Sequence, residues 1–155
     1  MHPHQQLVEK FYTCFGRRDW QGMIACYHPS VFFYDPVFEN LEAPEVKAMW
    51  EMLCRNETDL SLTFSNIEAD DEYGTCTWTA TYTFSKTGRK VVNVIKAHFK
   101  FHENSIIEHM DAFDLWKWSR QALGVQGLLL GWSPVVQNKI RAMAKRNLEK
   151  FMKAG

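Results

Sequence analysis

The chain has 155 residues, enough for one domain with a sizeable hydrophobic core and too few for two such domains. Its hydrophobic fraction of 46% and charged fraction of 23% are ordinary for a globular protein and exclude a disordered or fibrous chain. The formal net charge is zero, which argues against broad binding to nucleic-acid backbones. We therefore expect a single domain over residues 1–155 and no nucleic-acid partner.

The cysteines and the apolar segments indicate a cytoplasmic protein. Cysteines lie at positions 14, 26, 54 and 76, without the paired spacing that is typical of zinc sites. No N-terminal segment has the features of a signal peptide. The longest apolar stretch, Gly127 to Trp132, is too short to span a bilayer. We expect reduced cysteines, a cytoplasmic location and no membrane partner.

Helical periodicity dominates the first third of the chain. Asp19 is a typical N-cap, and Pro29 ends the helix that Asp19 would begin. A β-branched and aromatic run bounded by prolines interrupts the helical pattern and predicts a strand. The elements predicted in this part are helices over residues 5–15, 19–27 and 44–54, and a strand over residues 31–35.

After Asp59 the apolar residues alternate with polar ones, as in strands. The strands predicted from this pattern cover residues 60–67, 76–84, 91–101 and 106–118. The turns between them are short, which indicates antiparallel neighbours. Helical spacing returns from Ser133 to Ala154. This order predicts an α+β fold, in which a curved antiparallel sheet packs on the N-terminal helices and an extra helix follows.

Two features near the C-terminus have more than one interpretation. Residues 119–132 mix small residues with leucines and could plug the open end of a curved sheet. Residues 135–155 carry six basic side chains and one acidic one, whereas acids outnumber bases ten to two between Glu39 and Glu72. A basic helix is compatible with a nucleic-acid or membrane-surface contact. We interpret it instead as a solvated face that complements the acidic half.

Asp35 is the first candidate for chemistry, because it ends a predicted strand in an aromatic segment, Phe32 to Phe38. A carboxylate among aromatic side chains loses hydration, which raises its pKa toward neutrality, where a general base is useful. The alternative is a structural Asp-Pro turn, in which the side chain accepts hydrogen bonds from nearby backbone N–H groups. The local sequence favours neither interpretation.

Residues 107–114 contain the second pair of candidates, His109 and Asp111. On a strand these two side chains share a face with Phe113, and they lie about 7 Å apart. Polar side chains set into an apolar face are typical of a binding pocket. A buried His–Asp pair that serves only the structure is the alternative.

The remaining histidines are weaker candidates. His98 and Lys96 share a face of the preceding strand, and either could reach the interior. A metal site from His98, His109 and the aspartates is compatible by ligand type, but the spacing does not specify one. We expect no metal and no cofactor. His2 and His4 belong to a terminus that we expect to be frayed.

The chain resembles the nuclear transport factor 2-like superfamily, and within it the SnoaL-like polyketide cyclases and the ketosteroid isomerases. The segments that carry this resemblance are Val8 to Met23, Phe33 to Phe38, His98 to Phe101 and Ile106 to Asp111. The resemblance covers about residues 5–118 as the domain core, and residues 119–155 form a helical extension outside it.

The resemblance implies a cone-shaped domain that encloses an apolar pocket, often within a homodimer. Asp35 falls at the position of the isomerases' proton-abstracting carboxylate. His109 and Asp111 lie where SnoaL-like cyclases place polar residues of an acid–base site. Phe11 and Ala97 replace the two oxyanion donors of the isomerases, which argues against steroid isomerisation. The residues expected to line the pocket are Phe11, Phe33, Trp50, His98 and Phe113.

Two functions follow as hypotheses. The first is a cofactor-independent acid–base enzyme of the isomerase, cyclase or hydrolase type, acting on an apolar carbonyl or polyketide-like compound, with Asp35, His109 and Asp111 as catalytic residues. The second is a non-catalytic module that binds a hydrophobic ligand or dimerises. Both predict a small apolar molecule as partner, and both are compatible with a homodimer.

Overall fold

The computed structural model describes residues 1–57 and 59–155. The helices are α1 (Pro3–Gly16), α2 (Trp20–Ala25), α3 (Ala43–Asn56), α4 (Leu115–Leu123), α5 (Val125–Leu130) and α6 (Pro134–Ala154). The strands are β1 (Tyr27–Asp35), β2 (Glu39–Glu42), β3 (Ser61–Ala69), β4 (Tyr73–Phe84), β5 (Arg89–His102) and β6 (Ser105–Ala112).

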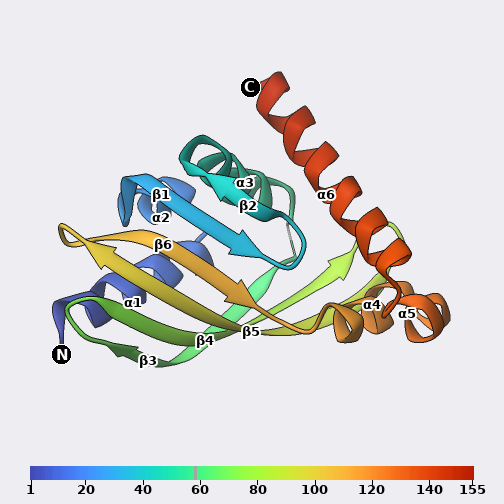
Figure 1. The fold of residues 1–155 in the computed structure, drawn as a ribbon, viewed down its shortest axis with the longest axis horizontal. Helices are drawn as coiled ribbons and strands as arrows, with labels where there is room; N and C mark the ends of the chain where they lie inside the picture. The colour runs from blue at the N-terminus through green and yellow to red at the C-terminus, as the bar shows by residue number, and fades with distance from the viewer. Residues whose placement is uncertain (58) are drawn as a thin grey trace.

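The strands form one sheet in the order β2-β1-β6-β5-β4-β3. Neighbours are antiparallel except β1 and β6, which run parallel. Figure 1 shows β4 and β5 as long curved strands, with α1 and α3 packed on one face of the sheet. The predicted α+β fold and the antiparallel strands after residue 60 are confirmed, but the sheet is mixed rather than wholly antiparallel.

The core lies between the helices and the concave face of the sheet. Along β4 and β5 buried and exposed residues alternate, as the period of two predicted. The helices contribute their apolar faces, with Phe11 and Tyr12 of α1 and Trp50 of α3 almost wholly buried. The four cysteines are free thiols, and three of them are buried. Burial of this aromatic surface is the main source of stability.

Two predicted elements end earlier than expected, and one strand was not predicted. The helix predicted over residues 19–27 ends at Ala25, and Tyr27 already belongs to β1. The strand predicted over residues 106–118 ends at Ala112, because Asp114 caps α4 by accepting a hydrogen bond from the Lys117 N–H at 3.1 Å. The edge strand β2 was not predicted, since four residues are too few for a clear pattern.

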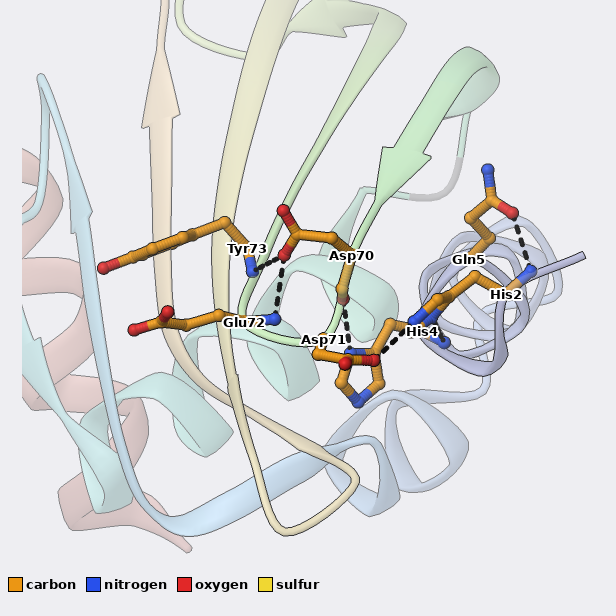
Figure 2. A network of polar contacts seen from close by, with 7 residues as sticks. All are labelled: His2, His4, Gln5, Asp70, Asp71, Glu72 and Tyr73. Carbon is orange, nitrogen blue, oxygen red and sulfur yellow. Dashed lines mark hydrogen bonds and ion pairs between the residues drawn. The ribbon is translucent and has the colours of Figure 1, made fainter.

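The start of α1 is fixed to the turn between β3 and β4, which Figure 2 shows. His2 is the N-cap of α1 and its ring contacts Asp71 at 2.8 Å. The His4 ring bonds the Asp70 carbonyl oxygen at 2.8 Å, while the Asp70 side chain accepts from two N–H groups of the turn. The expectation of a frayed terminus is therefore wrong, because these histidines close the first turn of the helix.

The C-terminal helix α6 lies against α3 and leads away from the sheet (Figure 1). Lys145 forms an ion pair with Glu39 at 2.6 Å, and the Arg141 Nε donates to the Pro36 carbonyl oxygen at 2.8 Å. Ile140 and Leu148 are its buried residues. Within the described ranges, no helix combines the length and hydrophobicity needed to cross a membrane.

The helices α4 and α5 approach each other through glycine. Gly127 is buried, and a Cβ built on it would overlap the Ser119 carbonyl oxygen. A Cβ on Gly131 would come within 2.7 Å of the Ser119 Cβ. The two glycines, four residues apart, thus form the face of this segment that packs on α4.

We expect Gly127→Ala to lower the free energy of unfolding by about 1–3 kcal/mol, since the added methyl group forces α4 and α5 apart. Thermal or urea unfolding measures the effect. Gly16→Ala is the matched control, because a Cβ there meets nothing within 4 Å. An equal effect of the two substitutions would mean that α4 and α5 are not in close contact.

Candidate functional site

A cavity of about 210 Å³ lies between the helices and the concave face of the sheet. Most of its wall is aromatic or aliphatic. The apolar lining residues are Phe15, Phe33, Val37, Phe38, Met49, Trp50, Leu53, Leu60, Trp78, Ala80, Phe84, Ile95, Phe113 and Trp118. The polar ones are Asp35, Glu57, Tyr82, Asn93 and Asp111. An apolar cavity with a few convergent polar groups is the usual form of a small-molecule site.

Asp35 and Asp111 lie side by side on adjacent strands. In the parallel β1–β6 pairing Phe33 lies opposite His109 and Tyr34 opposite Met110. One more residue in this register places Asp35 beside Asp111, and the charge of Asp111 acts on the pKa of Asp35. Adjacent strands are about 4.8 Å apart, and both side chains line the cavity. The structure therefore brings two of the predicted catalytic residues together as a pair of carboxylates.

The Asp35 carboxyl group has two different oxygens. Its Oδ1 accepts hydrogen bonds from the backbone N–H groups of Val37 at 2.8 Å and Phe38 at 2.6 Å. Among the described residues, Oδ2 has no hydrogen-bond partner. Burial raises the pKa of Asp35 to about 6, and the charge of Asp111 adds to this rise, while the two N–H groups oppose it. The turn predicted as the alternative is formed by Oδ1, while Oδ2 stays available toward the cavity.

The raised pKa of Asp35 makes the stability of the protein depend on pH. Between the ordinary pKa near 3.8 and the folded value of about 6, the folded chain binds more protons than the unfolded chain. The free energy of unfolding therefore falls as the pH rises through this window.

Asp35→Asn removes this titration, so we expect it to raise the free energy of unfolding by about 1–2 kcal/mol at pH values above about 7, and to give no gain near pH 4. The side chain is partly exposed, so solvent keeps the gain below that of a fully buried carboxyl group. Urea unfolding across this pH range checks it. Asp71→Asn, at an exposed position, is the control that should show no such pH-dependent gain. Parallel pH curves for wild type and Asp35→Asn would contradict the prediction.

Asp111 is held by a series of buried hydrogen bonds that begins at Trp50. The Trp50 Nε1–H donates to the Tyr27 hydroxyl oxygen at 2.9 Å, and that hydroxyl lies 2.8 Å from Nδ1 of His109. Nε2 of His109 is 2.9 Å from Oδ1 of Asp111. The same carboxylate oxygen accepts a longer bond, 3.4 Å, from the Trp78 Nε1–H.

These contacts assign the proton on His109. The Tyr27 oxygen already accepts from Trp50, so its own hydrogen is free to donate to Nδ1 of His109. With Tyr27 as the donor, Nδ1 of His109 is the acceptor and Nε2–H donates to Asp111. With this tautomer, every bond in the series donates toward Asp111 and holds its carboxyl group in place. His109 is fully buried and outside the cavity wall, so it orients Asp111 and does not face the cavity.

The residues predicted to line the pocket have different positions. Phe33, Trp50 and Phe113 do line the cavity. Phe11 is buried behind it, where its ring meets the His109 ring edge-on at 5.6 Å. The prediction for His98 is wrong, because β5 turns alternate residues to opposite faces: Ala97 is buried and His98 is exposed on the outer face.

The proposed plug of residues 119–132 is also wrong, since none of these residues is part of the cavity wall. Trp118, directly before the segment, closes that end of the cavity. Its Nε1–H donates to the Tyr82 hydroxyl oxygen at 2.7 Å.

Four polar residues of the site were not predicted from the sequence, and Glu57 at the cavity wall is one of them. Tyr27 was assigned to a helix, so its link to His109 was hidden. Tyr82 and Asn93 belong to adjacent strands, where Asn93 pairs with Ala80, and both line the cavity. The Asn93 amide has no hydrogen-bond partner among the described residues. The alternation along β4 and β5 was a signal that could have found them, because it directs both side chains inward.

Comparisons with known proteins agree with this architecture. Residues 8–109 match the SnoaL-like domain. An NTF2-like protein of unknown function from Burkholderia pseudomallei has 21% identity and a TM-score of 0.69, and the alignment covers 78% of this chain and 98% of that one. None of the curated proteins matches.

Two further solved structures are similar. A candidate polyketide cyclase from Pseudomonas putida has 19% identity and a TM-score of 0.65, over 79% of this chain and 98% of that one. TerC, crystallised with polyporic acid, has 16% identity and a TM-score of 0.63, and the alignment covers 73% of this chain and 92% of that one. At these identities the similarity establishes the fold. The match over residues 8–109, together with this fold, shows that the chain belongs to the SnoaL-like domain family and has the NTF2-like fold.

Proposed function

We propose that this protein is a cofactor-independent acid–base catalyst that removes a proton next to the carbonyl group of a small apolar, polyketide-like compound. The observation that carries the proposal is the pair of adjacent carboxylates, Asp35 and Asp111, in an aromatic cavity. In such a pair one group becomes more basic because the other keeps its charge.

Asp35 is the base in this proposal. Its pKa of about 6 leaves it ionised at neutral pH and basic enough to take a proton from carbon. When Asp35 accepts the proton, its repulsion with Asp111 is relieved, which favours the transfer. Asp111 is the positioning partner, held by hydrogen bonds with His109 and Trp78.

The resulting enolate oxygen needs hydrogen-bond donors. Tyr82 accepts from Trp118 through its oxygen, so its hydroxyl hydrogen is available to a ligand, and the Asn93 amide provides further donors. Return of the proton to another carbon gives isomerisation, while attack of the enolate carbon on a second carbonyl closes a ring. The SnoaL-like family and the candidate polyketide cyclase among the similar structures support this class of reaction.

The cavity volume limits the substrate. At about 210 Å³ the cavity is larger than the roughly 150 Å³ that holds benzene in an engineered protein, and smaller than typical drug sites of about 300 Å³ or more. We therefore propose substrates with one or two rings. The Glu57 carboxyl at the wall, whose pKa burial raises, adds a polar group for a substrate hydroxyl.

The experiment is hydrogen–deuterium exchange in D₂O, followed by NMR, on a panel of one- and two-ring aromatic ketones and 1,3-diketones. We expect the protein to accelerate exchange of the hydrogens next to the carbonyl, with a rate that rises with pH to a plateau above about pH 6. A panel that binds without any accelerated exchange would overturn the proposal.

The second candidate is a binding module without turnover. The observation that favours it is the turn after β1, where the Val37 and Phe38 N–H groups donate to Oδ1 of Asp35. These bonds restrict the motion of the carboxyl group, as in a structural residue that does not transfer protons. The same panel separates the two candidates, because the module predicts saturable binding, seen as NMR line broadening, with exchange at the rate of the free ketone.

A further inference from the structure

A group of apolar side chains is exposed at the end of the molecule that carries α4 and α5, opposite the N-terminus (Figure 1). These residues have exposed fractions from 50% to 72%, which is unusual for side chains so close in sequence. We call them the apolar tip: Val125, Leu128, Leu129, Leu130, Trp132 and Val135.

The packing of the glycines explains why the apolar tip faces outward. Gly127 and Gly131 occupy the side of the segment that contacts α4, where a Cβ would meet Ser119. No large side chain fits on that side, so the leucines and the tryptophan must lie on the other side. The exposure of the apolar tip is therefore a consequence of close packing between α4 and α5 and not of loose packing.

The apolar tip contains no charge and is bordered by cations. No charged residue occurs from Gln121 to Asn138. The β4–β5 hairpin lies against the end of α4, because Thr87 Oγ1 donates to the Ala122 carbonyl oxygen at 2.5 Å and Arg89 Nε to that of Gln121 at 2.8 Å. The bordering basic residues are Lys86, Arg89 and Lys90 of the hairpin, Lys117 and Arg120 of α4, and Lys139 of α6.

These six cations have no acidic partners. Within the described part of the chain, none of them forms an ion pair. Arg120 stacks on the Trp116 ring at 4.5 Å, and its Nε is buried without a hydrogen bond. Asp70 and Asp71 lie at the other end, beside the N-terminus (Figure 2). Asp114, the N-cap of α4, is an acidic residue on the side of the apolar tip. The charge distribution thus gives the apolar tip a positive border and the opposite end negative groups.

We propose that the apolar tip binds the interface of a membrane that contains anionic lipids. Leucines and a tryptophan without charges suit the boundary between headgroups and acyl chains, while a border of lysines and arginines is attracted to anionic headgroups. The segment is too short to span the bilayer, so the protein lies on the surface. This proposal departs from the expectation of no membrane partner, which rested on the length of the apolar stretch and on the interpretation of the basic helix as a solvated face.

The experiment is co-sedimentation of the full chain with vesicles of two compositions. One contains phosphatidylcholine alone, and the other roughly a three-to-one mixture of phosphatidylcholine and phosphatidylglycerol. We expect binding to the mixed vesicles at least about tenfold stronger than to the neutral ones, and weaker as salt screens the cations. No binding to the mixed vesicles would overturn the proposal.

Two double variants assign the binding to the apolar tip. Leu129→Ser with Trp132→Ser should lower the affinity for mixed vesicles about tenfold or more, since it removes two large apolar anchors. Its control is Val94→Ser with Met110→Ser, at exposed apolar positions on the outer face of the sheet, which should bind as wild type does. Equal loss in the two variants would contradict a specific role of the apolar tip.

The charge contribution is tested separately. Lys117→Gln with Lys139→Gln should weaken binding to mixed vesicles about thirtyfold, at about 1 kcal/mol per lysine near the surface, and leave binding to neutral vesicles unchanged. Lys47→Gln with Lys96→Gln, at exposed positions of α3 and β5, is the matched control. A different result would contradict the proposal: wild type does not bind the vesicles, and ultracentrifugation shows that it is a dimer whereas the Leu129/Trp132 variant is a monomer. The apolar tip would then be a contact between copies of the chain.

Discussion

Asp35→Asn is expected to slow exchange of the ketone hydrogens by a factor of about 10²–10⁴, the usual contribution of a general base. An amide of nearly the same shape replaces the carboxylate but cannot accept the proton. The Asn oxygen can still accept the hydrogen bonds that Val37 and Phe38 donate, so the turn after β1 should be retained. Exchange rates measured by NMR for wild type and variant provide the comparison.

The pH profile distinguishes a lost base from a disturbed fold. The wild-type rate should rise with pH up to about 6, following the pKa of Asp35, and the variant's residual rate should lack that rise. Asp71→Asn, far from the cavity on an exposed turn, serves as control and should exchange at the wild-type rate. A variant Asp35→Asn that keeps the wild-type rate and profile would assign the base to another residue.

Tyr27→Phe should lower the free energy of unfolding by about 2–4 kcal/mol, although it removes a single oxygen atom. Without the hydroxyl, the Trp50 Nε1–H loses its acceptor and Nδ1 of His109 loses its donor. Both groups belong to almost fully buried side chains, and each unsatisfied partner costs about 1–3 kcal/mol. Urea unfolding at neutral pH gives the difference directly.

The control for this substitution is Tyr73→Phe, since Tyr73 is 54% exposed. We expect that variant to stay within about 0.5 kcal/mol of wild type. The Tyr27 variant should also exchange ketone hydrogens more slowly, because His109 no longer has a fixed tautomer to orient Asp111. Equal stability of the Tyr27 and Tyr73 variants would show that the series from Trp50 to Asp111 is not formed.

Much of the fold was predictable from local patterns. Alternation of apolar residues predicted β4 and β5, and the turns after Phe84 and His102 predicted their antiparallel pairing. Helical spacing and Pro134 at the first turn predicted α6. These signals depend on neighbours in the sequence, which is why they were read correctly.

The arrangement of the site was less predictable because it depends on contacts between distant segments. Asp35 and Asp111 are neighbours only through the parallel pairing of β1 with β6. These strands are far apart in the sequence, so no hairpin turn between them predicts the pairing. Tyr27 was misassigned because the pattern of α2 continues across Cys26, whereas the chain turns there into β1. His98 was misplaced by one position, and in a strand a shift of one residue reverses the side of the sheet.

The series of hydrogen bonds from Trp50 to Asp111 has an electrostatic consequence. The bond dipoles of an indole, a phenol and an imidazole are aligned head to tail, with their positive ends toward the Asp111 carboxylate. The Asp111 carboxyl group is thus held by aligned dipoles, and the described residues of the cavity wall include no lysine or arginine. A lysine or arginine beside Asp111 would lower the pKa of Asp35, so the use of dipoles at this place lets Asp35 stay basic.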